Sequence, residues 1–429
     1  MLAIAATTFA MGADAQYKPS DEIRQSQTEF QDSKFGIFIH WGLYSMLGDG
    51  EWVMNNKDIN HKEYAHLADG FCPARFNADE WVKAFKAAGA KYITFTSRHH
   101  DGFSMFATKT SKYNVVDGTP FRRDVLKEIA DACHRHGLDL HVYYSHLDWY
   151  RTDYPLGRTG RNLGRPTDKQ DYAGYLGFMK SQLTEILTGY GPIRAIWFDG
   201  VWDHDEDATP FDWRLREQYD LIHRLQPSCM VANNHHGKPF EGEDIQIFEQ
   251  DLPGENTYGL SGQDISPLPL ETCLTMNRKW GYSITDKQYK SVDNLIRELV
   301  RAAGKNCNLL LNVGPRPDGQ LPAEAIERLQ AIGNWLQANG ETVYGTRAGI
   351  VAPHPWGVTT QKGNRLFVHI LSHADRSLFL PVPARRVAKA RMYNGDAKVV
   401  AQATRDGVLL QLPEVPSGVD TIVELTLKD

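Results

Sequence analysis

The sequence predicts an α/β protein in which a (β/α)8-like TIM barrel is followed by a C-terminal antiparallel β-sandwich. Three observations predict this fold. Strand-like and helix-like segments alternate from about residue 19 to residue 346, and several strand-like runs end in polar side chains. After residue 345 the pattern changes to short strands without helices. We therefore expect a barrel over residues 16–345 and a sandwich over residues 346–429.

Seven apolar runs are expected to form barrel strands, and four of them end in groups that can carry chemistry. The runs cover residues 35–42, 92–101, 141–146, 195–200, 230–234, 244–249 and 308–313. The groups near the ends of the first four are His40, His99, His100, Tyr144, His146 and Asp199. Polar groups at the carboxyl ends of barrel strands mark the active face of this fold. A carboxylate among histidines and aromatic rings suits sugar chemistry.

The intervening segments have helical spacing. In residues 78–88, for example, Trp81, Phe85 and Ala88 lie on one helical face, and Gly137 stops the helix expected over 124–136. Further helices are expected over 171–190, 211–225, 291–303 and 323–339. In the C-terminal part, strands are expected over 366–371, 378–382, 388–393, 408–412 and 421–425, with a hairpin turn at Asp406–Gly407.

Composition excludes several classes of function. The 429 residues carry a net charge of −6 and no basic stripe, which argues against a nucleic-acid partner. The five cysteines are odd in number and form no Cys-x-x-Cys pair, so we expect neither a zinc knuckle nor a disulfide framework. No run of about 18 apolar residues predicts a membrane span. The ten tryptophans fit either a large core or a carbohydrate site.

The N-terminus carries a separate signal. Residues 1–15 are apolar and end in Ala13-Asp14-Ala15, which fits the small-x-small cleavage site of a secretory signal peptide, although a basic start is missing. A frayed N-terminal tail is the alternative. The signal peptide predicts a periplasmic or secreted protein.

Asp199 is the leading catalytic candidate. It lies two residues after Trp197, so both side chains share one face of the strand. A carboxylate at the barrel mouth can attack an anomeric carbon, but Asp199 could equally cap the turn at Gly200. A retaining glycosidase needs a second carboxyl about 5–5.5 Å away. Glu249 and Glu271 are the candidates, although the acidic run around Glu249 is also typical of a solvated loop.

The histidines and one tryptophan are candidates for binding. No His-x-His or His-Glu-x-x-His spacing indicates a metal site, and neighbours His99 and His100 would point to opposite faces unless the strand bends. Neutral imidazole both donates and accepts hydrogen bonds, which suits sugar hydroxyls. Glu51 and Trp52 offer an acceptor beside an apolar platform, or form an ordinary surface turn.

At this point the motifs resemble those of the α-L-fucosidases of glycoside hydrolase family 29. They are the segments 35–42, 51–52, 97–103, 143–145, 197–200, 271–273, 280–282 and 308–315, in this order. The resemblance implies a retaining exo-hydrolase that releases α-L-fucose from glycans and needs no metal or organic cofactor. It implies that Asp199 is the nucleophile, with Glu249 as acid/base and Glu271 as runner-up.

The resemblance also implies a fucose pocket. Its lining would comprise His40, Glu51, Trp52, His99, His100, Tyr144 and Trp197. Many family members carry Asn-Asp-Arg where this chain has the segment 233–237, so His235 stands where an arginine would contact the sugar. Three alternatives stay open: a non-catalytic fucose-binding protein, a glycosidase for a related sugar, and a metal-dependent hydrolase. A fucosylated oligosaccharide is the expected partner, and an oligomer is possible.

Overall fold

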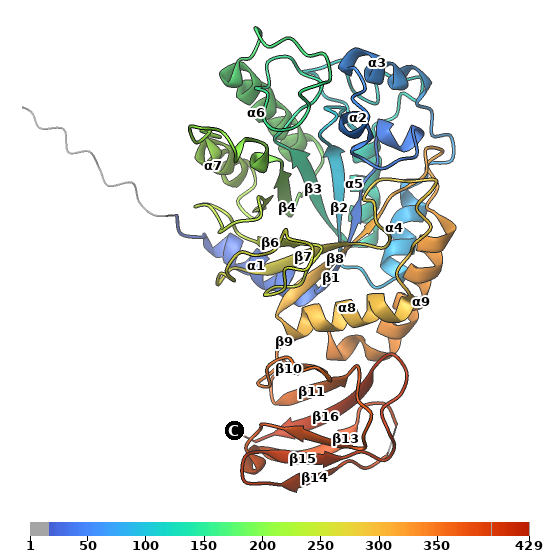
Figure 1. The fold of residues 1–429 in the computed structure, drawn as a ribbon, viewed down its shortest axis with the longest axis vertical. Helices are drawn as coiled ribbons and strands as arrows, with labels where there is room; N and C mark the ends of the chain where they lie inside the picture. Colours follow the sequence, from blue (N-terminus) through green and yellow to red (C-terminus); the bar gives the residue numbers. More distant parts are fainter. Residues whose placement is uncertain (1–16, 396, 429) are drawn as a thin grey trace, which may run out of the picture.

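The computed structural model describes residues 17–395 and 397–428, and its two parts are a barrel and a smaller β-structure beneath it (Figure 1). The predicted signal peptide, residues 1–15, lies outside the described residues. The barrel is an eight-stranded parallel sheet with the order β5-β4-β3-β2-β1-β8-β7-β6. A parallel bridge between Ala232 and Ile245 joins the two outermost strands, so the sheet closes on itself. The predicted α/β fold class is confirmed.

The strands of the barrel are short and almost entirely buried. They are β1 (Phe35–Ile39), β2 (Tyr92–Arg98), β3 (Asp139–Ser145), β4 (Ala195–Asp199), β5 (Met230–Asn234), β6 (Gln246–Glu249), β7 (Leu270–Thr275) and β8 (Cys307–Val313). Seven of them correspond to the predicted runs. Strand β7 contains the motif around Glu271, which the sequence analysis did not assign to a strand.

Six longer helices surround the barrel. They are α4 (Ala78–Ala87), α5 (Val125–His136), α6 (Tyr172–Gly189), α7 (Leu215–Leu225), α8 (Val292–Gly304) and α9 (Ala323–Asn339). Helix α7 starts four residues later than predicted. Arg214, just before its first residue, has a φ of 51° in the left-handed region, so the helix cannot extend back through it. Shorter elements fill the loops: α2 (Val53–Asn56), α3 (His61–Ala65), η1 (Leu43–Met46), η2 (His66–Gly70), η3 (Val201–His204) and η4 (Gly340–Thr342).

Helix α1 (Asp21–Ser33), which the sequence analysis missed, closes the amino-terminal end of the barrel. The Ser20 side chain caps it by accepting from the Ile23 amide. Phe30 is 4% exposed and contacts the Tyr92 ring at a centroid distance of 5.4 Å. Asn308 of β8 also donates to the Phe30 carbonyl. The barrel therefore opens to ligands at its carboxyl end.

The C-terminal part is a sandwich of two antiparallel sheets. One has the order β13-β16-β11-β10-β9 and the other β12-β15-β14. The elements are β9 (Arg347–Ala348), β10 (Gly357–Lys362), β11 (Arg365–Ile370), β12 (Ser377–Leu380), η5 (Ala384–Arg386), β13 (Val387–Met392), β14 (Val400–Ala403), β15 (Val408–Gln411) and β16 (Thr421–Leu427). Ala403 pairs with Val408, so Asp406–Gly407 does lie in a hairpin turn. Strands β9, β10 and β14 were not predicted.

The sandwich packs against α8 and the end of α9, away from the barrel mouth (Figure 1). Its strand β10 lies so close to α8 that a Cβ on Gly304 would come within 2.5 Å of Val358. Arg297 of α8 donates to the Val419 carbonyl. This arrangement keeps the described residues of the sandwich out of the active-site lining described below.

Candidate active site

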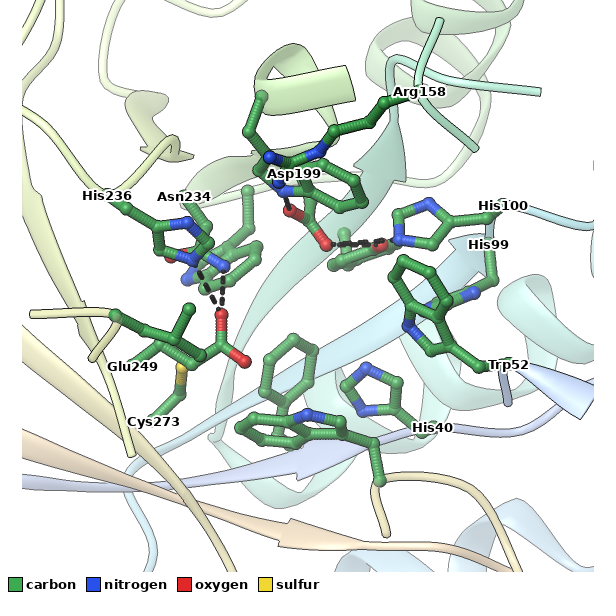
Figure 2. Close-up of a pocket in the computed structure, with 16 residues that line it drawn as sticks. His40, Trp52, His99, His100, Arg158, Asp199, Asn234, His236, Glu249 and Cys273 are labelled. Atoms are coloured by element: carbon green, nitrogen blue, oxygen red, sulfur yellow. Dashed lines mark hydrogen bonds and ion pairs between the residues drawn. The ribbon is translucent and has the colours of Figure 1, made fainter. Parts of the chain in front are cut away.

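A pocket of about 290 Å³ lies at the carboxyl ends of the barrel strands. It contains two carboxylates, four histidines and a set of aromatic rings (Figure 2). The lining residues are Phe38, His40, Trp52, His99, His100, Tyr143, Arg158, Trp197, Asp199, Trp202, Asn234, His236, Glu249, Leu260, Cys273 and Trp280. Seven of these were named from the sequence: His40, Trp52, His99, His100, Trp197, Asp199 and Glu249.

Asp199 presents its carboxylate to the pocket from the last position of β4. The Trp202 indole N–H donates to Oδ1 at 2.9 Å, and the Tyr143 hydroxyl donates to Oδ2 at 2.9 Å. These contacts are with side chains, so the carboxylate does not serve as a cap for the turn at Gly200. Burial, with the nearby charge of Glu249, raises the pKa of Asp199 to about 6, although both hydrogen bonds act to lower it.

Glu249 ends β6 and enters the same pocket from the other side. The Asn234 amide donates to its Oε2 at 2.7 Å, and His236 Nε2 lies 2.9 Å from the same oxygen. Asn234 is also the backbone neighbour of Asp199 in the pairing of β4 with β5, so its contact with Glu249 starts from the position beside Asp199. The acidic run around Glu249 is thus not simply a solvated loop, because Glu249 is half-buried by its partners and Asp244 is fully buried.

The pKa order of the two carboxyls differs from the one expected for the mechanism. Burial acts to raise the pKa of Glu249, but the hydrogen bond and charge of His236, helped by Asn234, bring it below its ordinary value. The pKa of Asp199 is instead the raised one. The simple repulsion of two carboxyls therefore does not leave Glu249 as the protonated member, and His236 is the cause.

The hydrogen-bond partners of His40 and His100 fix their tautomers. The Asn312 amide N–H₂ donates to the Trp280 carbonyl, so its Oδ1 accepts from His40 Nδ1 at 2.7 Å. Ser145 Oγ donates to the Leu147 carbonyl and accepts from His100 Nδ1 at 2.7 Å. Both rings therefore keep Nε2 as an acceptor.

Burial lowers the pKa of both rings, that of His40 to about 3, and keeps them neutral. Sugar hydroxyls can donate to the two Nε2 atoms. The Nε2 of His100 lies 3.6 Å from Asp199 Oδ2, so a single hydroxyl could contact both acceptors.

His99 and His100 both line the pocket because β2 ends in an irregularity. The register with β3 shifts between Thr96 and Arg98, and the two imidazole centroids lie 4.1 Å apart. The bend allowed for in the sequence analysis is therefore present. His99 also stacks on Tyr143 at 5.3 Å, and its buried Nδ1 has no hydrogen-bond partner among the described residues.

Tyr144 was predicted to line the pocket, and this prediction is wrong. Its hydroxyl donates to Gln182 of α6 at 2.7 Å, and the Arg98 guanidinium lies 5.1 Å from its ring. Side chains alternate along β3, so Tyr143 points into the barrel and takes the place assigned to Tyr144.

Glu51 and His235 are also not part of the described lining. Glu51 is 4% exposed, and its Oε2 accepts from the Gly281 amide at 2.8 Å, which fixes the loop that carries Trp280. His235 pairs with Glu243 at 3.1 Å and packs on Phe240, outside the pocket. Its neighbour His236 has a φ of 58°, and this left-handed conformation accompanies the turn of its ring into the pocket.

Glu271 lies beneath the pocket rather than in it. The Trp197 indole donates to Oε1 at 2.9 Å, and the Tyr92 hydroxyl donates to Oε2 at 2.5 Å. Burial raises the pKa of Glu271 to about 7. Both of its oxygens are occupied inside the barrel, so Glu271 supports the Trp197 ring and is not placed to protonate a leaving group.

Sequence reasoning missed several lining residues. Trp202 lies two residues after the motif 197–200, and Trp280 is the first residue of the motif 280–282. The Trp202 ring stacks on Trp52 at a centroid distance of 5.7 Å. Arg158 comes from the long loop after β3, which has no strand or helix signal near it. Its guanidinium lies 5.1 Å from the Trp202 ring. A residue of this kind is found from the folded loop and not from a pattern.

Residues 17–395 and 397–428 lack the features of two other classes of site. No group of three or more His, Cys, Asp or Glu side chains there is arranged to hold a metal ion. No helix in those residues is both long enough and apolar enough to cross a membrane. The five cysteines are free thiols, and Cys72 is the exposed one.

Comparison with known proteins identifies the family. The sequence model of the α-L-fucosidase family matches residues 4–341. The chain belongs to the α-L-fucosidase family. It is 28% identical to mouse tissue α-L-fucosidase over 90% of this chain and 88% of the relative. The chain is accordingly a glycoside hydrolase, and a fucosylated glycan is its class of substrate.

Solved structures of α-L-fucosidases have the same architecture. Isoenzyme 1 from Paenibacillus thiaminolyticus superposes with a TM-score of 0.84 at 36% identity, covering 95% of this chain and 100% of that one. The enzyme AlfC from Lactobacillus casei, solved with its α-L-fucose product, gives a TM-score of 0.65 at 30% identity, over 74% of this chain and 99% of that one. The match to isoenzyme 1 spans nearly the whole of this chain and so includes both the barrel and the sandwich, whereas the match to AlfC leaves about a quarter of this chain uncovered.

Proposed function

We propose that this protein is a retaining exo-α-L-fucosidase with Asp199 as nucleophile and Glu249 as general acid/base. The observation that carries the proposal is the opposed placement of these two carboxylates in one small pocket at the barrel mouth. Asn234 supports the closeness of the two carboxylates, because it pairs with Asp199 along the strands and its side chain donates to Glu249. A compact pocket of about 290 Å³ suits removal of a terminal residue from a chain.

The first step forms a covalent glycosyl-enzyme. An Asp199 oxygen attacks the anomeric carbon, the glycosidic bond breaks, and Glu249 gives its proton to the departing oxygen. Asp199 must be ionised for this attack. Because its pKa is about 6, it is ionised above that pH and becomes protonated as the pH falls. Activity should therefore be lost on the acid side as pH falls through about 6.

The second step hydrolyses the ester. Glu249 takes a proton from a water molecule, the water oxygen attacks the anomeric carbon, and Asp199 leaves as a carboxylate, so configuration is retained. During both steps His40 and His100 offer Nε2 acceptors to the sugar hydroxyls.

One side of the pocket is apolar, which favours a sugar with a methyl group, such as fucose, over a sugar with a hydroxymethyl group at the same position. Phe38 packs edge-on against Trp197 at 5.1 Å and against Trp280 at 5.9 Å. Such a surface receives a methyl group without leaving a polar group unpaired. A glycosidase for a related sugar is the second candidate, and a higher kcat/KM for the corresponding aryl α-galactoside would favour it.

Replacement of the nucleophile tests the proposal. Asp199→Ala should lower kcat on an aryl α-L-fucoside by roughly 10³-fold or more. Azide should restore turnover and give a fucosyl azide of inverted configuration, because it enters the space left by the carboxylate. The matched control is Asp205→Ala, an exposed carboxylate six residues further along, which should keep wild-type kcat. Near-normal activity of Asp199→Ala would reject the assignment.

A location outside the cytoplasm is a further proposal. It rests on the cleavage pattern at Ala13–Ala15, which is a sequence feature alone. Sequencing the N-terminus of the natural protein tests it, and a mature chain starting at Gln16 is the expected result.

A further inference from the structure

We propose that His236 shares the acidic proton of Glu249, so that the acid/base of this enzyme is a Glu249–His236 pair and not a lone carboxyl. His236 is in this account a positioning residue that acts through Glu249. The inference rests on the function proposed above, because it presupposes that Glu249 is the acid/base.

The geometry supplies a direct path between the two groups. His236 Nε2 lies 2.9 Å from Glu249 Oε2, and the Asn234 amide donates to the same oxygen at 2.7 Å. Figure 2 shows both contacts on one oxygen, with the other turned to the pocket. Among the described residues Oε1 has no hydrogen-bond partner, so it is the oxygen available to the leaving group. The two donors on Oε2 thus hold the Glu249 side chain in the rotamer that directs Oε1 to the pocket.

The backbone at His236 is built for this contact. Its φ of 58° lies in the left-handed region, where residues other than glycine are uncommon and asparagine, aspartate and histidine are the most frequent of them. In this conformation the His236 side chain, 20% exposed, pairs with the Glu249 carboxylate, which is 14% exposed. A half-buried pair of this kind keeps a strong interaction without full desolvation.

The charges around His236 favour a proton on the pair. Burial acts to lower the pKa of His236, but the hydrogen bond and charge of Glu249, with the charge of Asp199, raise it above its ordinary value. Arg158 acts in the opposite direction. His236 also borders an outer groove, whose titratable side chains are His204, Asp205, Asp207, His235 and Lys238. None of these last groups lies between His236 and Glu249.

One proton on the pair has two arrangements. In the first, Glu249 is a carboxylate and His236 an imidazolium. In the second, the proton has crossed the 2.9 Å contact, Glu249 is a carboxylic acid and His236 is neutral. The second arrangement protonates the leaving oxygen when the glycosidic bond breaks, which leaves a carboxylate and a neutral ring. In hydrolysis of the ester the pair takes one proton back from water, so the protons balance over the cycle.

This account predicts the alkaline side of the pH profile. A pair that can hold a proton on either member loses it at a pH no lower than the carboxyl alone would. Removing the imidazole should therefore move the alkaline limb of kcat/KM to lower pH. The charge of His236 also acts to lower the pKa of Asp199, so the acid limb should move to higher pH in the same variant.

The test uses His236→Asn, because asparagine tolerates the left-handed backbone, its amide does not titrate, and its side chain is shorter than that of histidine. The substrate is an aryl α-L-fucoside with a poor leaving group, which requires the acid. We expect the ratio of kcat/KM at pH 8 to that at pH 6 to fall several-fold relative to wild type. On a 2,4-dinitrophenyl fucoside, whose phenolate leaves without a proton, only the shift of the acid limb remains, so the ratio should not fall.

Two controls separate this inference from the proposed function. His235→Asn changes the neighbouring histidine, which faces Glu243, and should keep the wild-type alkaline limb. Glu249→Gln should remove activity on the substrate with the poor leaving group, whether or not His236 shares the proton. If Glu249→Gln behaves so and His236→Asn keeps the wild-type limb, the pair is rejected and the proposed function stands. If Glu249→Gln has no such effect, the proposed function itself fails.

A measurement on the unaltered His236 covers the case in which the variant does not fold. In protein labelled with ¹⁵N-histidine, the pKa of His236 should lie above 6.5 in wild type and fall in Glu249→Gln. The same pKa in both proteins would overturn the proposal.

Discussion

The mouth and the interior of the barrel each hold a buried glutamate, and the two differ in what occupies their oxygens. Glu249, at the mouth, has both hydrogen bonds on Oε2 and keeps Oε1 open to the pocket. Glu271, one layer deeper, accepts from Trp197 on one oxygen and from Tyr92 on the other. The residue type is the same, but the Glu249 side chain is 14% exposed and Glu271 is fully buried. Exposure and the arrangement of donors together decide which carboxyl can exchange a proton with a substrate.

The two regions also differ in what their neighbours do to the pKa. At the mouth, His236 outweighs burial and brings the pKa of Glu249 below its usual value. In the interior, no charged partner opposes burial, and the pKa of Glu271 rises to about 7. The mouth is thus built to change its protonation during a reaction, and the interior is built to hold an aromatic wall in place.

The largest expected difference comes from removing Glu249. Glu249→Ala should lower kcat/KM on a fucosylated oligosaccharide by roughly 10²- to 10⁴-fold, because the leaving oxygen then departs without a proton. On a 2,4-dinitrophenyl fucoside the loss should be far smaller. Measuring both substrates gives the comparison, and an equal loss on both would place the acid elsewhere.

A smaller difference is expected between two adjacent tyrosines. Tyr143→Phe removes the donor to Asp199, so the pKa of Asp199 should rise and the acid limb of kcat/KM should move to higher pH, with a loss of about tenfold near pH 6. Tyr144→Phe removes the bond to Gln182 and the interaction of the hydroxyl with Arg98, both outside the pocket. It should keep the wild-type pH profile and lower the free energy of unfolding by about 1 kcal/mol. A shifted limb in Tyr144→Phe would contradict the placement of the two side chains.

The smallest effect on catalysis is expected at Glu271. Glu271→Gln keeps the shape of the side chain, and the Tyr92 hydroxyl can turn to accept from the new amide. We expect kcat/KM to stay within roughly tenfold of wild type on good and poor leaving groups alike, with a free energy of unfolding lower by about 1 kcal/mol. A loss that grows as the leaving group worsens would exchange the roles of Glu271 and Glu249.

Much of the fold could be predicted because its signals are local. The runs that became seven barrel strands are apolar, and the helices between them have clear spacing and glycine stops. Strand β7 was missed because half of its residues are polar, so it gives no continuous apolar run. The loops that join β5 to β6 and β6 to β7 also contain no helix, so the strand–helix alternation is interrupted there. Helix α1 was missed because most of its residues are polar.

The site was harder to predict, because one position along a strand decides which side a residue faces. Asp199 and Trp197 were placed on one face from their spacing, and both line the pocket. Tyr144 and Tyr143 are equally plausible from sequence, and the twist and register of β3 settle the choice. The same holds for His235 and His236, where a left-handed residue reverses the expected direction.

Partners distant in sequence could not be predicted at all. The lowered pKa of Glu249 depends on His236, which comes from the loop after another strand. The tautomer of His40 depends on Asn312, which is 272 residues away. These contacts exist only once the barrel has closed.

The most direct test of the central claim is covalent trapping. A 2-deoxy-2-fluoro-fucosyl fluoride slows the second step, so the sugar should accumulate as an ester on the enzyme. After pepsin digestion, mass spectrometry should find the fluorofucosyl mass on one peptide, with fragmentation placing it on Asp199. A label on any other residue, or turnover of the reagent with inversion and without a label, would contradict the account.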